Sequence, residues 1–131
     1  MDHKDKNWYR AQSLIQGWLR YHGVHSHLAG YLDPYDLVTN SGKRLEIKLS
    51  EFCPKKRHWS FNIQRHNILD ESQVDAYVLR FNPGAASVVL GIYPFHLVMP
   101  APIGVKNIRM AARNLLCGRW AEHFNNVEIL R

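Results

Sequence analysis

The stretch from Asp33 to Ser50 constrains the fold more than any other part of the chain, because charged and apolar residues alternate there around a glycine-containing turn. Its second half reads Lys-Arg-Leu-Glu-Ile-Lys-Leu-Ser, and side chains along a β-strand point alternately to opposite faces. Three aliphatic residues therefore share one face, while Glu46 and Lys48 share the other. The pattern predicts a β-hairpin whose second strand has one face suited to a core and one that carries an acid and an amine.

The turn between the two predicted strands decides which residues face each other. A three-residue loop over residues 40–42 needs Gly42 in the left-handed conformation that such loops favour. This loop pairs Asp36 with Glu46. A two-residue turn would instead place Asp36 opposite Ile47, because a slip of one residue reverses the faces of a strand. We favour the three-residue loop, which brings two carboxylates together.

The rest of the sequence predicts elements that can surround this hairpin. Apolar residues at helical spacing predict a helix from Asn7 to His22, which Gly23 ends. Apolar or alternating runs predict further strands at 24–32, 59–64, 74–81 and 87–93. Helical spacing returns at 105–117, and a terminal strand is predicted at 127–130. The expected architecture is α/β, with a mixed β-sheet flanked by helices in a single domain of residues 1–131.

Positive charge is concentrated in two segments of the chain. The formal net charge is +6, which favours a polyanionic partner such as DNA. One segment is a basic loop after Pro54, and the other is a basic stripe at i, i+3 and i+7 of the predicted helix at 105–117. The predicted phosphate-binding residues are Lys55, Lys56, Arg57, Lys106, Arg109 and Arg113.

Cysteine usage and hydropathy argue against several classes of protein. Cys53 and Cys117 lie far apart and form no C-x-x-C pair, so neither a disulfide framework nor a zinc ribbon is indicated. The first residues lack the apolar core of a signal peptide, and prolines interrupt the most apolar stretch, 85–103. We therefore expect a cytoplasmic protein that does not enter the membrane.

The predicted pair of Asp36 and Glu46 calls for a cation, because facing carboxylates repel each other. Mg²⁺ suits such a site, since it binds one or two carboxylates with water and phosphate, and the carbonyl of Ile47 can contribute. Lys48 would orient or activate the attacking water, or offset charge in the transition state. An acid and an amine alternating on a strand also occur on ordinary solvated faces, where they form only a cross-strand charge pair.

The order of these features resembles the PD-(D/E)XK nuclease superfamily, and most of all its small Holliday-junction-resolvase and endonuclease branch. The resemblance rests on a helix and a strand, then Pro34-Tyr35-Asp36, a glycine turn, Glu46-Ile47-Lys48 and another strand, and it spans about residues 8–81. It implies a restriction-endonuclease-like fold and Mg²⁺-dependent phosphodiester hydrolysis, with Mn²⁺ as a substitute. It also implies metal ligands at Asp36 and Glu46, a catalytic amine at Lys48 and an accessory catalytic position at Gln64.

Two features depart from the pattern of that superfamily. Tyr35 separates the proline from Asp36, which leaves Asp33 as an alternative acidic ligand. Many members supply a glutamate from the first helix, and the predicted helix here offers Gln12 or Gln16 instead. The number of bound metal ions is therefore left open.

The leading functional prediction is a Mg²⁺-dependent DNA endonuclease. No base-reading helix of a known motif is present, so branched or otherwise structured DNA is a candidate substrate. A homodimer would supply the two sites that paired cuts need. The alternative is a catalytically inactive nucleic-acid-binding module on the same fold, and a third reading is a partner-binding structural protein whose basic faces are incidental.

Overall fold

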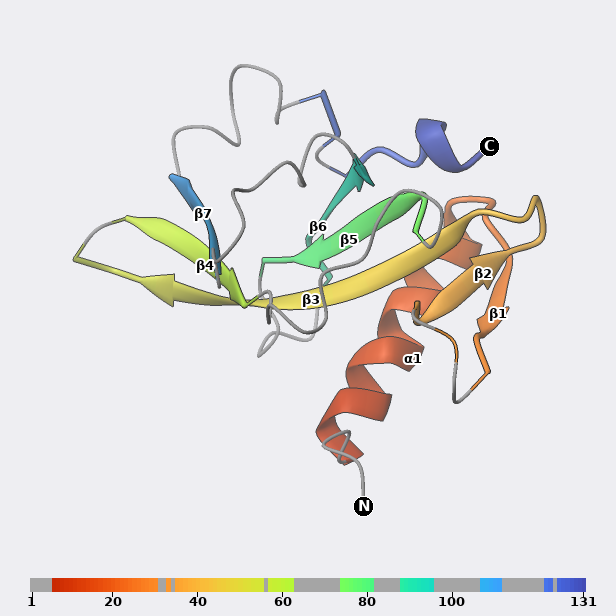
Figure 1. The fold of residues 1–131 in the computed structure, drawn as a ribbon, viewed down its shortest axis with the longest axis horizontal. Helices are drawn as coiled ribbons and strands as arrows, with labels where there is room; N and C mark the ends of the chain where they lie inside the picture. The colour runs from red at the N-terminus through yellow and green to blue at the C-terminus, as the bar shows by residue number, and fades with distance from the viewer. Residues whose placement is uncertain are drawn as a thin grey trace.

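The main elements of the described part of the chain are one α-helix, seven β-strands and a short 3₁₀ helix (Figure 1). The computed structural model describes residues 6–30, 33, 35–55, 57–62, 74–81, 88–95, 107–111, 122–123 and 125–131. In chain order the elements are α1 (Lys6–Tyr21), β1 (Ser26–Leu28), β2 (Leu37–Thr39), β3 (Arg44–Cys53), β4 (His58–Asn62), β5 (Ala76–Arg80), β6 (Leu90–Pro94), β7 (Asn107–Ala111) and η4 (Glu128–Leu130).

The long strand β3 belongs to two parts of one seven-stranded sheet. Its first half pairs antiparallel with β2 and parallel with β5, and β1 and β6 extend this region on either side. Its second half pairs antiparallel with β4, which in turn pairs with β7. The sheet is therefore mixed, and the predicted α/β class is confirmed. Figure 1 shows β4 and the far end of β3 extending away from α1.

Helix α1 packs its apolar face onto one face of the sheet. Ile15 and Leu19 of α1 are fully buried in one cluster with Leu45 and Ile47 of β3. The aliphatic face predicted for β3 is thus the core face, so Glu46 and Lys48 occupy the face of β3 opposite α1.

The end of α1 is set by the predicted glycine. Gly23 has a φ of +85°, in the left-handed region. The N–H of Val24 donates to the carbonyl of Leu19 at 2.8 Å, and the N–H of Gly23 donates to that of Arg20 at 3.0 Å. These are the two hydrogen bonds of a Schellman motif, which satisfies carbonyls at the end of a helix.

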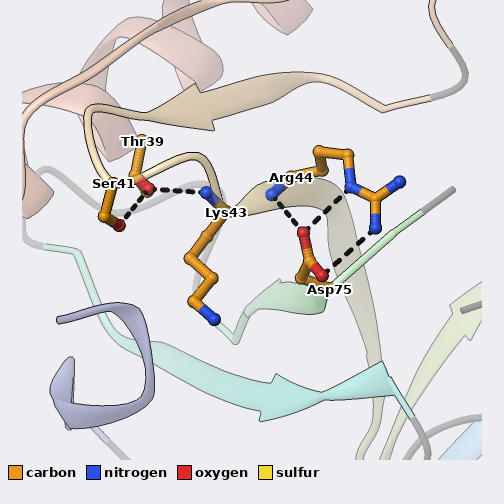
Figure 2. A network of polar contacts seen from close by, with 5 residues as sticks. All are labelled: Thr39, Ser41, Lys43, Arg44 and Asp75. Atoms are coloured by element: carbon orange, nitrogen blue, oxygen red, sulfur yellow. Dashed lines mark hydrogen bonds and ion pairs between the residues drawn. The ribbon is translucent and has the colours of Figure 1, made fainter. Parts of the chain in front are cut away.

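Arg44 and Asp75 fix the parallel pairing of β3 with β5 (Figure 2). The backbone N–H and Nε of Arg44 donate to Oδ2 of Asp75 at 2.8 and 2.9 Å, and Nη2 donates to Oδ1 at 3.2 Å. In return the N–H of Asp75 donates to the carbonyl of Arg44 at 2.9 Å. Because Asp75 directly precedes β5, these contacts set the register that places Glu46 beside Tyr77.

Two predicted elements at the C-terminal end are wrong. Residues 107–111 form strand β7, not part of a helix at 105–117. The run Ile108-Arg109-Met110 is too short to distinguish the apolar spacing of a helix from that of a strand. Pairing with β4 supplies backbone hydrogen-bond partners, which favours the strand. Residues 128–130 form η4 in place of a strand, which brings Val127 and Leu130, three apart, into the core.

The other strand predictions are confirmed with shorter or shifted bounds. The runs at 24–32, 59–64, 74–81 and 87–93 contain or overlap β1, β4, β5 and β6. Among the described residues, no helix is long and apolar enough to cross a membrane.

Asp75→Asn is expected to lower the free energy of unfolding by about 1 kcal/mol at pH 7, because the charge-assisted hydrogen bonds from Arg44 are weakened at a partly exposed site. The side-chain hydrogen bond from Arg44 lowers the pKa of Asp75. The ionised Asp75 carboxylate therefore contributes fully to stability above the unfolded-state pKa of about 4. This contribution is lost as the pH falls through the lower folded-state pKa. Urea titrations from pH 7 to pH 2.5 should show the difference from wild type shrinking below about pH 4.

Glu128→Gln is the matched control. It removes one charge from an exposed ion pair in which Arg131 Nε and Glu128 Oε1 are 3.8 Å apart, and it should change stability by less than about 0.5 kcal/mol. A stability difference for Asp75→Asn that grew toward low pH would contradict this account of the Arg44–Asp75 contact.

Candidate functional site

The hairpin that carries the candidate site has the predicted three-residue loop. Gly42 has a φ of +91°. The N–H of Thr39 donates to the carbonyl of Lys43 at 2.9 Å, and the N–H of Gly42 donates to the carbonyl of Thr39 at 2.9 Å. The strands pair Leu37 with Leu45 and Val38 with Arg44. The three-residue register is confirmed, and the two-residue turn is excluded.

Hydroxyl groups hold this turn in place. Oγ1 of Thr39 accepts from the N–H of Lys43 at 3.0 Å and lies 2.9 Å from Oγ of Ser41 (Figure 2). Oγ of Ser41 also donates to the carbonyl of Leu130 at 3.2 Å, which joins the turn to η4. The turn that sets the register is therefore tied to a distant part of the chain.

Asp36 is held from several sides just before β2 and is only 7% exposed. Its N–H donates to the carbonyl of Leu45 at 2.8 Å. Its carbonyl accepts from the N–H of Ala29 at 3.0 Å and from Nε2 of Gln12 at 3.2 Å. Its carboxylate Oδ2 accepts from the N–H of Ile47 at 2.8 Å. The carboxylate therefore lies against the backbone of β3 at the residue between Glu46 and Lys48.

The structure also separates the two acids that the sequence left as alternatives. The carboxylate of Asp33 is exposed and accepts from the N–H of Gly30 at 2.7 Å, within its own loop. Asp36, in contrast, contacts β3. Of the two glutamines of α1, Gln12 bonds to Asp36, while Nε2 of Gln16 donates to the carbonyl of Ser26 at 3.4 Å.

Glu46 and Lys48 are half-buried and stand in two rows that cross three strands. The parallel and antiparallel registers align Glu46 with Tyr77 and then Tyr93. The same registers align Lys48 with Leu79 and then Gly91. Residues paired on neighbouring strands share a face of the sheet. The acid and the amine therefore border a face that also carries two buried tyrosines.

Gly91 allows Tyr93 to lie across this face. A Cβ at position 91 would overlap the ring and hydroxyl of Tyr93. Gly91 and Tyr93 are both buried in β6, so the ring has little room to move away. The glycine is therefore required by packing, because its own φ is not in the left-handed region.

Burial keeps the two tyrosines protonated. It raises the pKa of Tyr93, and it raises the pKa of Tyr77 together with a smaller effect from the negative charge of Glu46. This effect agrees with the strand register, which makes Tyr77 the β5 neighbour of Glu46. Sequence reasoning did not identify Tyr77, since parallel partners lie far apart in the chain and no local signal gives their register.

The available donors suit a hard cation that keeps much of its water. In the described ranges, no group of three or more His, Cys, Asp or Glu side chains could hold a metal. The predicted ligand set of Asp36, Glu46 and the Ile47 carbonyl offers only oxygen atoms. The Ile47 side chain is buried in the core, so only its backbone is available. Two carboxylates with a carbonyl and water fit Mg²⁺ better than a transition metal.

The predicted phosphate-binding residues are only partly placed. Lys55 and Arg57 are exposed in the turn between β3 and β4. Arg109 lies in β7, paired with Ser60 of β4, so the predicted basic stripe on a helix is wrong. The residues that fall outside the described part of the chain are Lys56, Gln64, Lys106 and Arg113.

Comparisons with known proteins place the fold. No protein-family model matches the sequence, and no curated protein matches it either. Among solved structures, the fold is similar to that of a bacterial homing endonuclease, I-Ssp6803I, with a TM-score of 0.67. The match covers 93% of this chain and 87% of that chain at 13% sequence identity. The two chains therefore share a nuclease-like α/β fold.

Gly91→Ala is expected to lower the free energy of unfolding by about 1–3 kcal/mol, because the new methyl group overpacks against the buried Tyr93 ring. Gly17→Ala is the matched control. Gly17 is exposed in the middle of α1, where an added Cβ meets nothing within 4 Å, so alanine should stabilise by up to about 1 kcal/mol. Urea denaturation measures both. Wild-type stability in Gly91→Ala would mean that Tyr93 is not confined over β6.

Proposed function

We propose that this chain is a metal-dependent DNA endonuclease of the PD-(D/E)XK type. The observation that carries the proposal is the hydrogen bond from the Ile47 N–H to the Asp36 carboxylate, which holds that acid against β3 at the residue between Glu46 and Lys48 in the sequence. A buried carboxylate fixed beside a second acid and an amine is the arrangement that such a reaction needs. The fold shared with a protein described as a homing endonuclease supports the same class of reaction.

Asp36, Glu46 and the Ile47 carbonyl are the proposed ligands of Mg²⁺, with Mn²⁺ as a substitute. The metal, when bound, supplies a Lewis acid at the phosphate. One oxygen of the Asp36 carboxylate accepts a hydrogen bond from the Ile47 N–H, and this bond fixes the orientation of the whole carboxylate. Lys48 shares the face of Glu46, two residues along β3, where its ammonium can orient the attacking water or stabilise charge on the phosphate.

A second candidate function is a nucleic-acid-binding module without catalysis. The observation in its favour is the identity of residue 12. The α1 side chain that touches Asp36 is an amide, Gln12, which brings no negative charge to the site. With fewer carboxylates, metal affinity falls and a single ion is the expected stoichiometry.

The proposed DNA-facing region follows β3 from the candidate site to the turn before β4. Lys55 and Arg57 are exposed there, and the same strand carries Glu46 and Lys48 in its first half. Basic side chains at such a turn would bind backbone phosphates rather than read bases. We also propose that the substrate is branched DNA and that a homodimer makes paired cuts.

Glu46→Ala and Lys48→Ala are each expected to reduce cleavage at least about 100-fold, because one removes a proposed metal ligand and the other a charge that stabilises the transition state. Supercoiled plasmid, linear duplex and a four-way junction are incubated with Mg²⁺, Mn²⁺ or EDTA. Lys43→Ala and Glu128→Ala remove an amine and an acid outside the proposed site and should cut like wild type. Salt-sensitive binding by wild type without metal-dependent cutting would favour the binding module, and neither activity would contradict both functions.

The double variant Lys55→Glu/Arg57→Glu is expected to bind DNA at least tenfold more weakly at 100 mM salt. If each side chain contacts one phosphate, the slope of log K against log salt should become shallower by about 1.8. Arg10→Glu/Arg20→Glu makes the same change of charge on exposed residues of α1. An equal loss of affinity in both double variants would show a general effect of charge and not a contact at the β3–β4 turn.

A further inference from the structure

We propose that Tyr77 is a positioning residue that orients the Glu46 carboxylate. This role rests on the proposed function of Glu46 as a metal ligand. The parallel register makes Tyr77 the residue of β5 directly beside Glu46, on the same face of the sheet. Tyr77 is 1% exposed, so it is part of the protein interior, while Glu46 beside it is half-buried.

The surroundings of Tyr77 hold its ring in one place. Tyr93 is paired with it on the β6 side, and the ring of Phe95 stacks with its centroid 6.0 Å away and the planes 25° apart. The Arg44–Asp75 contacts at the start of β5 fix its position along β3. The Tyr77 ring therefore has a fixed place beside Glu46.

A metal ligand must hold its carboxylate in one orientation, and Asp36 and Glu46 would achieve this through different donors. Asp36 is oriented by the N–H of Ile47. Glu46 has a longer side chain with more rotatable bonds, so its carboxylate must be oriented by a neighbour if it is to bind a metal in one geometry. With a metal bound, the Tyr77 hydroxyl would donate to the Glu46 oxygen that does not face the ion. Each of the two acids then has its own orienting donor.

Tyr77→Phe removes the hydroxyl and keeps the ring. Calorimetric titration of the full chain with Mn²⁺, without DNA and far below the melting temperature, should show about tenfold weaker binding than wild type, the loss typical when the partner of a metal ligand is removed. DNA binding in EDTA should not change. Cleavage should fall at low Mn²⁺ and recover at saturating Mn²⁺, which a merely misfolded variant would not do.

Tyr93→Phe is the matched control, because Tyr93 is a buried tyrosine of the same row that lies one strand further from Glu46. It should bind Mn²⁺ like wild type. Equal Mn²⁺ affinity in Tyr77→Phe and wild type, with binding lost in Glu46→Ala, would overturn the positioning role and leave the metal site standing. Equal affinity in wild type and Glu46→Ala would overturn the metal site and the role of Tyr77 together.

Discussion

The parallel pairing of β3 with β5 is the constraint on which the rest of this structure depends. Parallel neighbours cannot be joined by a tight turn, so their register must be set by contacts between distant residues. Arg44 and Asp75 provide those contacts through both backbone and side chain. The register that results packs Ile47 and Val78 into the core and, on the opposite face, sets Glu46 beside Tyr77. The pairing of β3 with β5 thus builds the core on one face of the sheet and the candidate site on the other.

The two acids of the candidate site are placed by different parts of the fold. Asp36 depends on its immediate surroundings, where the hairpin and Gln12 of α1 bind its backbone and Ile47 binds its carboxylate. Glu46 is placed by the strand register, which sets it beside Tyr77 of β5 and then Tyr93 of β6. A proposed metal centre at this place would therefore join local and long-range structure. A mutation that disturbs either the hairpin or the pairing of β3 with β5 and β6 would therefore affect the same proposed metal centre.

Local sequence patterns predicted the parts of the fold that local geometry decides. Gly23 and Gly42 identified the end of α1 and the hairpin register, and alternation identified the faces of β3. The segment at 107–111 was mistaken for helix because only pairing with β4 distinguishes the two periods there. Tyr77 was missed for a related reason, since its place beside Glu46 depends on a register that no local pattern encodes. The metal-binding and catalytic roles of Asp36, Glu46 and Lys48 remain predictions.

The three-residue turn at Gly42 also bears on the order in which the chain folds. The hairpin of β2 and β3 closes a very short loop, whereas Arg44 and Asp75 are 31 residues apart. By the usual logarithmic dependence, closing the longer loop costs about 2 kcal/mol more in chain entropy. Local strand pairs form readily, while pairings between distant segments slow folding. The hairpin is therefore expected to form early, and the docking of β5 is expected to be the slow step that completes the fold.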